Sequence, residues 1–180
     1  MVFLLKSEDI VKEYAFDDGC PLSESQLNVY LNERVKNMGT TYNMPFKLKF
    51  LESYSVNEIK EAIYKLIEIY PILSARVVSN EDNIYLSFDK KPEIKVGSLK
   101  DIDSFIQPFE LDKTLSKFLI IENESILCID CHHLICDGTS KIILINKLKD
   151  ILEGSTTEYV DNGVLKQVSF EKKHSFTGIG

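Results

Sequence analysis

The 180-residue sequence has little of what marks a disordered, membrane-bound or nucleic-acid-binding protein. Its eight glycines and five prolines are too few for a low-complexity or linker-dominated chain. The 28 acidic residues outnumber the 21 basic ones, and the formal charge of -7 argues against a phosphate-binding surface. The apolar start meets a charge at Lys6, which is too early for a signal peptide or a membrane span. We therefore expect one soluble, cytoplasmic domain with no nucleic-acid or membrane partner.

Several common catalytic motifs are also missing. The sequence contains no G-x-S-x-G nucleophile elbow, no phosphate-binding loop, no G-x-G-x-x-G fingerprint and no visible internal repeat. Only three histidines occur, but His132 and His133 are adjacent, and Asp137 and Gly138 follow within five residues. Because the ordinary pKa of histidine lies near neutral pH, proton transfer is expected in this segment.

Three of the four cysteines, Cys128, Cys131 and Cys136, lie around the same histidines. The first two fit the haem-attachment pattern C-x-x-C-H, and the cluster also resembles a set of zinc ligands. Residues 126–133, however, are apolar and β-branched like a strand, in which successive side chains point to opposite faces. Cys128 and Cys131 could then not converge on one metal or haem. We expect buried thiols and no metal, and a nucleophilic role for Cys131 or Cys136 beside His133 stays open.

The patterning along the chain predicts helices interspersed with short strands. Ser23 and Gln26 have the spacing of a capping box, which starts a helix that reaches about Lys36. Further helices are expected at 55–70, 99–106 and 139–152, and strands at 42–52, 76–78, 84–88, 94–96, 116–121 and 126–133. This order predicts an α/β (α+β) fold, in which helices cover a mixed, largely antiparallel sheet.

Elementary chemistry singles out three residues after the last strand. His133 stands at the strand end before a tight loop, so backbone holds it on both sides, and it is the first candidate for a general base. Asp137 could orient an imidazole, pair with an arginine or cap the following helix. Gly138 suits either a positive φ or a close approach by substrate. Taken singly, a buried structural histidine and a plain capping aspartate remain alternatives.

The string H-H-L-I-C-D-G-T-S at 132–140 resembles the HHxxxDGxS signature of the condensation domains of nonribosomal peptide synthetases. These domains belong to the chloramphenicol acetyltransferase-like acyltransferases. Residues 22–26 are similar to the family's early S-x-A-Q motif, and residues 107–111 to its P-F-D-L segment. The family's R-H-E-x-L-R-T stretch is altered, since residues 69–76 keep one arginine, displaced by two positions. The basic partner of the aspartate in the signature therefore stays open.

The resemblance also implies a division of the chain. Condensation domains have two chloramphenicol acetyltransferase-like lobes in tandem, with the active site in a tunnel between them. The length fits one lobe, so we expect an N-terminal lobe at 1–154 and a connector towards a missing C-terminal lobe at 155–180. The fragment by itself is then expected to be inactive.

By resemblance, His133 would lie near the thioester carbonyl and the attacking amine, as base or as hydrogen-bond partner. Asp137 would structure the loop, and His132 would be mainly structural. A positioned base contributes about 10² to 10⁴ in rate. The developing oxyanion needs a donor, for which the backbone N–H near Gly138 is the candidate.

The substrates implied are an acyl or peptidyl donor and an aminoacyl acceptor, each on the phosphopantetheine arm of a carrier domain. No cofactor or metal would bind the chain directly, and an adenylation domain and the C-terminal lobe would be further partners. Basic patches with Lys47, Lys49, Lys172 and Lys173 could dock carrier domains, or could form a solvated face. Two alternatives remain: an O-acyltransferase of the same superfamily, acting on an alcohol or lipid, and a non-catalytic module that docks carrier domains.

Overall fold

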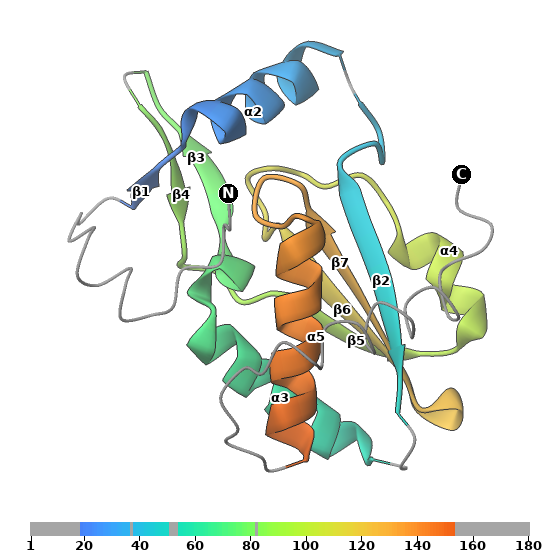
Figure 1. Ribbon diagram of the computed structural model, residues 1–180. Helices are drawn as coiled ribbons and strands as arrows, with labels where there is room; N and C mark the ends of the chain where they lie inside the picture. Colours follow the sequence, from blue (N-terminus) through green and yellow to red (C-terminus); the bar gives the residue numbers. More distant parts are fainter. Residues whose placement is uncertain (1–18, 37, 51–53, 82, 154–180) are drawn as a thin grey trace.

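The computed structural model describes residues 19–36, 38–50, 54–81 and 83–153, which form two sheets and the helices that cover them (Figure 1). The larger sheet has the strand order β2 (Asn43–Lys49), β7 (Ile126–His132), β6 (Ser116–Ile121), β5 (Glu93–Gly97). The smaller has the order β1 (Cys20–Pro21), β4 (Ile84–Ser87), β3 (Arg76–Ser79). The α-helices are α2 (Glu24–Lys36), α3 (Val56–Ile69), α4 (Ile102–Phe105) and α5 (Gly138–Leu152).

The larger sheet is mixed, as predicted. β7 pairs antiparallel with both β2 and β6, whereas β5 and β6 run parallel. Every residue of β7 is buried, because the strand is interior and both faces of the sheet are covered. The predicted alternation is confirmed, since Cys131 packs in the main core and Cys128 in a second apolar cluster on the opposite face. One metal ion could not be held by both thiols.

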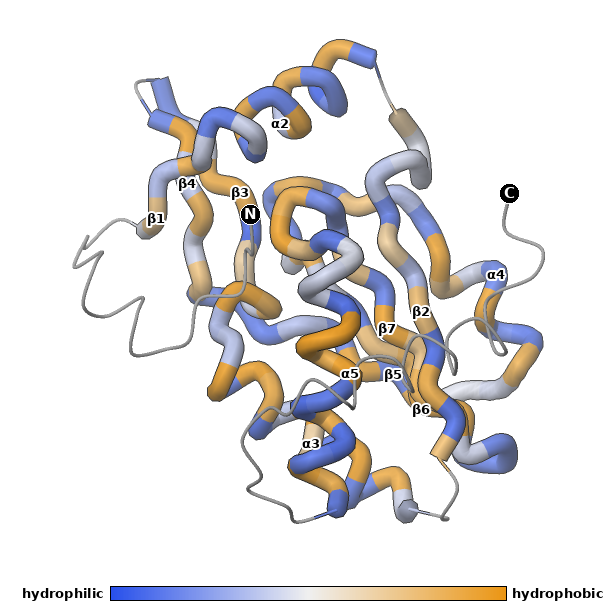
Figure 2. The backbone as a smooth tube through the Cα atoms, viewed as in Figure 1, coloured by the Kyte–Doolittle hydropathy of each residue, from blue (hydrophilic) through white to orange (hydrophobic). Residues whose placement is uncertain are grey.

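Two helices cover the main-core face of the larger sheet. Ser55 caps α3, and its side chain and that of Glu58 form the reciprocal bonds of a capping box. α3 then buries Ile59, Ile63 and Leu66 at helical spacing against the sheet and α5. Each fully buried aliphatic side chain of this size contributes about 2 kcal/mol. Figure 2 shows hydrophobic residues, in orange, recurring along α3, α5 and the central strands.

α2 is the outlying helix, and it crosses one end of the molecule between the smaller sheet and β2 (Figure 1). Its predicted capping box is confirmed: the Ser23 N–H donates to Gln26 Oε1 at 2.9 Å, and the Gln26 N–H donates to Ser23 Oγ at 3.3 Å. Below it, residues 107–115 tie the two sheets together. The Val77 N–H donates to the Leu111 carbonyl at 2.7 Å, and the His132 N–H donates to the Leu115 carbonyl at 2.8 Å.

The division into two sheets differs from the single sheet that the sequence predicts. The strands expected at 76–78 and 84–88 are present as the hairpin of β3 and β4, but this hairpin forms its own sheet with β1. The expected strand at 94–96 instead joins the larger sheet beside β6. Periodicity identifies a strand and its buried face, but it carries no information on which neighbour the strand pairs with. The predicted connector at 155–180 lies outside the described residues.

No helix in the described ranges is long and apolar enough to cross a membrane.

Candidate active site

The two histidines lie where β7 ends and a five-residue loop leads into α5. Asp137 is the N-cap of α5, and its Oδ1 accepts hydrogen bonds from the N–H and the hydroxyl of Ser140, both at 2.7 Å. Partial burial raises the pKa of Asp137, but these two hydrogen bonds outweigh it and leave the pKa below its usual range. Of the three uses that the sequence left open for Asp137, helix capping is the one observed.

Arg76 pairs with a residue other than Asp137. It is the single arginine retained from the altered family stretch. Its guanidinium holds both carboxylate oxygens of Asp89, at 2.6 and 3.0 Å. Within the described ranges no arginine forms an ion pair with Asp137. The N-cap hydrogen bonds with Ser140 therefore hold this aspartate in place.

His133 is exposed, and its ring is oriented by the loop that follows it. Its backbone N–H donates to the Tyr42 carbonyl at 2.8 Å, and its Nδ1 lies 2.9 Å from the Cys136 carbonyl oxygen. A carbonyl oxygen can only accept, so Nδ1 carries the hydrogen in the neutral ring. Nε2 is therefore left with a lone pair, which makes it the atom that can take up a proton.

His132 has the opposite environment, with no exposed surface. The Leu134 N–H donates to its Nδ1 at 3.0 Å, so Nε2 must carry the hydrogen, and it donates to Glu33 Oε2 at 2.6 Å. The Phe109 ring packs edge-on against the imidazole with centroids 5.7 Å apart. Burial lowers the pKa of His132 to about 3, so the ring is neutral at pH 7.

Two residues of α2 belong to this site, and the sequence analysis missed that role for both. Gln26 is buried, and its Nε2 donates to the Leu134 carbonyl at 2.8 Å while its Oε1 caps the helix. Glu33 accepts the His132 hydrogen bond from two turns further along. The seven-residue spacing on one helix face was the available signal, but nothing local indicates what that face contacts.

Gly138 is the first residue of α5 and has helical backbone, so the expected positive φ is wrong for it. The alternative fits the structure better. A side chain added here would meet nothing within 4 Å, so the space beside Gly138 is open to an approaching group. The N–H groups in the first turn of a helix have no intrahelical acceptor, and Gly138 presents one of them.

The cysteines beside the histidines are poorly suited to nucleophilic chemistry. Cys131 and Cys136 are both buried. A hydrogen bond with Cys136 and burial raise the pKa of Cys131 well above its ordinary value, which keeps it a protonated thiol. Of the lysines considered for docking, Lys47 and Lys49 lie on the edge strand β2, and Lys172 and Lys173 lie outside the described residues.

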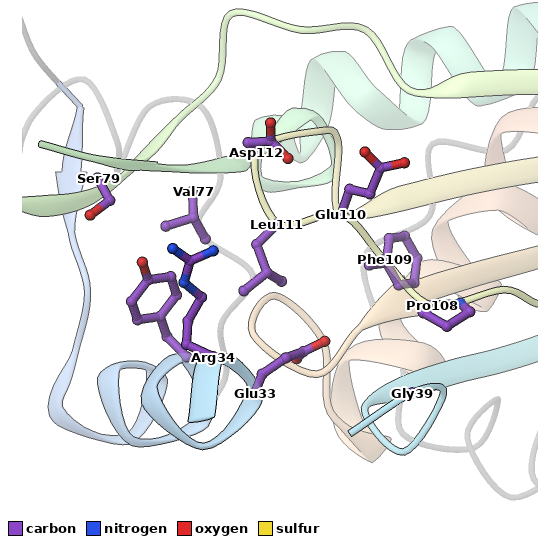
Figure 3. Close-up of a pocket in the computed structure, with 11 residues that line it drawn as sticks. Glu33, Arg34, Gly39, Val77, Ser79, Pro108, Phe109, Glu110, Leu111 and Asp112 are labelled. Atoms are coloured by element: carbon purple, nitrogen blue, oxygen red, sulfur yellow. The ribbon is translucent and has the colours of Figure 1, made fainter. Parts of the chain in front are cut away.

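A cavity of about 540 Å³ opens on the His132 side of the loop, between α2, β3 and the segment 108–112 (Figure 3). Glu33 and Phe109, which both contact His132, form part of its wall. The Arg34 guanidinium points into it between Val77 and Leu111. His133 does not line this cavity, so the two histidines face different spaces.

The sequence and the fold both match known proteins. The model of the family described as Condensation domain matches residues 17–162. Bacitracin synthase 3 of Bacillus licheniformis is 31% identical over 147 residues, which cover 75% of this chain and 2% of that protein. Surfactin synthase subunit 2 of Bacillus subtilis (strain 168) is 28% identical over 185 residues, covering 92% of this chain and 5% of that protein.

Solved structures show the same fold at low sequence identity. The starter condensation domain of rhizomide synthetase RzmA matches with a TM-score of 0.64 at 14% identity, over 86% of this chain and 43% of that one. The first condensation domain of the CDA synthetase matches with a TM-score of 0.62, over 84% of this chain and 46% of that one. These matches confirm the predicted chloramphenicol acetyltransferase-like fold class. The chain spans less than half of either domain and a few per cent of the curated synthases.

Proposed function

The chain belongs to the condensation-domain family and corresponds to its N-terminal portion, and we propose that it supplies the histidine half of an amide-forming active site in a nonribosomal peptide synthetase. One observation carries the proposal. His133 is exposed at a strand end, and its Nδ1–H donates to the Cys136 carbonyl, so the lone pair on Nε2 can accept a proton. The neighbouring His132 is neutral and buried, and it takes the structural role.

The chemistry proceeds by aminolysis of a thioester. The acceptor amine attacks the thioester carbonyl, a C–N bond forms, and the amine proton passes to His133 Nε2. The C–S bond then breaks, and the proton goes on to the leaving thiolate, which leaves as the thiol. The position that a Gly138 side chain would occupy is open, at the start of α5, and the Gly138 N–H is our candidate donor to the oxyanion. Asp137 maintains this geometry by capping α5.

Both substrates arrive on carrier domains, as acyl or peptidyl donor and aminoacyl acceptor on phosphopantetheine arms. Residues 1–154 form the N-terminal lobe, and 155–180 lead towards a C-terminal lobe that closes the other side of the tunnel. The matched condensation domains are more than twice as long as the matched part of this chain, which supports a second lobe. An adenylation domain belongs to the same synthetase, and the assembly works in the cytoplasm.

The direct test uses the full-length protein that contains this chain, with an acyl donor loaded on one carrier domain and an aminoacyl acceptor on another. Mass spectrometry of the carrier-bound products should show the amide. Ester formed with a hydroxyl acceptor, and no amide, would instead indicate the O-acyltransferase. Carrier binding without either product would indicate a docking module. The 180-residue chain alone, assayed in parallel, should give no product.

A further inference from the structure

We propose that α2 is a clamp that positions His133, and that Gln26 is its main positioning residue. The clamp consists of Gln26 and Glu33, each of which holds a neighbour of His133. The inference rests on the proposed function, because it assigns these side chains a role in keeping the base in place. The contacts themselves are independent of which acyl transfer the site performs.

Gln26 and Glu33 form hydrogen bonds with the residues on both sides of His133. On the C-terminal side, Gln26 Nε2 donates to the Leu134 carbonyl at 2.8 Å across 108 residues of sequence. On the N-terminal side, Glu33 Oε2 accepts from the His132 ring at 2.6 Å. Both peptide neighbours of His133 are therefore held by one helix. Its own N–H is held by Tyr42, at the start of β2.

Gln26 is placed to act on the loop as well as on its own helix. The residue is 7% exposed, and its two polar side-chain atoms have separate partners: Oε1 accepts from the Ser23 N–H, and Nε2 donates to the Leu134 carbonyl. A helix cap needs only the acceptor. The donor to Leu134 is the part that a capping role does not explain, so it can be removed without removing the cap.

Glu33 holds the other side through His132. Its carboxylate is partly buried, and burial raises its pKa. The Leu134 N–H donates to the other nitrogen of the same ring, so the His132 imidazole links Glu33 back to the residue that Gln26 holds. The imidazole and the Leu134 peptide thus form one connected path around His133, with both ends on α2.

The substitution Gln26→Glu separates the two functions of the side chain. When ionised, glutamate keeps an oxygen that accepts from the Ser23 N–H, but it has no donor for the Leu134 carbonyl. Ser23→Ala is the matched control, because it removes the Oγ that caps Gln26 and leaves the donor to Leu134 in place. Glu33→Gln retains an oxygen that accepts from His132, so it is the conservative variant for the Glu33 contact.

Two measurements test the clamp. The first uses long-range 1H–15N NMR on the 180-residue chain, which reports the ring nitrogen of His133 that carries the hydrogen. Wild type, Ser23→Ala and Glu33→Gln should show the hydrogen on Nδ1 alone, whereas Gln26→Glu should show a mixture of the two tautomers. In the full-length protein, Gln26→Glu should lower kcat on the order of 100-fold with little change in KM, since misplacement of about 1 Å costs about that much. Ser23→Ala should keep kcat near wild type.

An unchanged His133 tautomer in Gln26→Glu would overturn the clamp, and so would an equal loss of kcat in Ser23→Ala. If Gln26→Glu fails to fold, Gln26→Met replaces it. Methionine removes both hydrogen bonds of the side chain without adding a charge, and Ser23→Ala shows how much of the loss comes from a weakened helix cap. A wild-type protein that forms no amide would contradict the proposed function only. The NMR comparison would still decide whether α2 holds His133.

Discussion

His132 and His133 are adjacent and identical, yet the fold places them in opposite surroundings. The first is fully buried between Glu33, Phe109 and the Leu134 N–H, with its hydrogen on Nε2. The second is exposed, with its hydrogen on Nδ1. The difference arises because neighbouring side chains at a strand end point to opposite faces. One histidine can therefore stabilise the loop while the other meets a substrate.

The same comparison extends to the space beside each ring. The His132 side contains the cavity of about 540 Å³ and the inner face of α2. The His133 side contains the start of α5 and the open volume next to Gly138. Burial and paired hydrogen bonds dominate on the first side, whereas the second side has an exposed imidazole and open space beside Gly138. Substitutions on the two sides should thus affect different measurements.

The largest effect is expected from His133→Ala. Removal of the Nε2 acceptor should lower amide formation by the full-length protein by about 10²- to 10⁴-fold. The ring is exposed and makes one hydrogen bond, to the Cys136 carbonyl, so the free energy of unfolding should fall by no more than about 1 kcal/mol. Product analysis and urea denaturation check the two parts. Normal product formation by a folded variant would show that His133 is not the base.

Asp137→Ala should lower both stability and activity, because the N-cap supports the histidine loop and α5 together. It removes the acceptor of two hydrogen bonds from Ser140, which is itself fully buried. We expect a loss of about 2 kcal/mol in unfolding free energy together with lower activity. Asp137→Asn keeps a capping oxygen and should recover most of the stability. An unchanged melting temperature in Asp137→Ala would contradict the structural role.

The smallest effect is a pH dependence that comes from His132. Its pKa is about 3 in the folded protein and ordinarily near 6.5, so the unfolded chain binds more protons as the pH falls below 6.5. The unfolding free energy should therefore decrease, by about 1 kcal/mol between pH 6.5 and 5.5. Urea denaturation at these two pH values measures it. His133→Ala should retain this decrease, and His132→Phe should lose it; the same slope in both would show that His132 is not its source.

Much of the local structure followed from short-range patterns. The Ser23 and Gln26 spacing predicted the start of α2, and the helical pattern at 55–70 predicted α3. Alternation along 126–133 predicted which cysteines lie on which face. These features depend on residues within one or two turns, or on the two-residue period of a strand. Asp137 was predicted less sharply, since capping, pairing and ring orientation all suit an aspartate before a helix.

The contacts that distinguish the two histidines could not be predicted in this way. Gln26 reaches Leu134 over 108 residues, and Glu33 reaches His132 over 99. The partner of β5 and the separation of the smaller sheet have the same character. A pattern states that a residue faces inward, but the element it then meets depends on how the whole chain packs.

The sequence by itself determined the main helices, every strand except β1, the burial of the β7 thiols, the family resemblance and the segment that holds the chemistry, because these depend on neighbouring residues. Only the tertiary structure decided that Arg76 pairs with Asp89, that Gly138 has helical backbone, and that α2 holds the histidine loop. It also decided which nitrogen of each ring is free. That property depends on the acceptor or donor brought within about 3 Å by folding, which no spacing along the chain records.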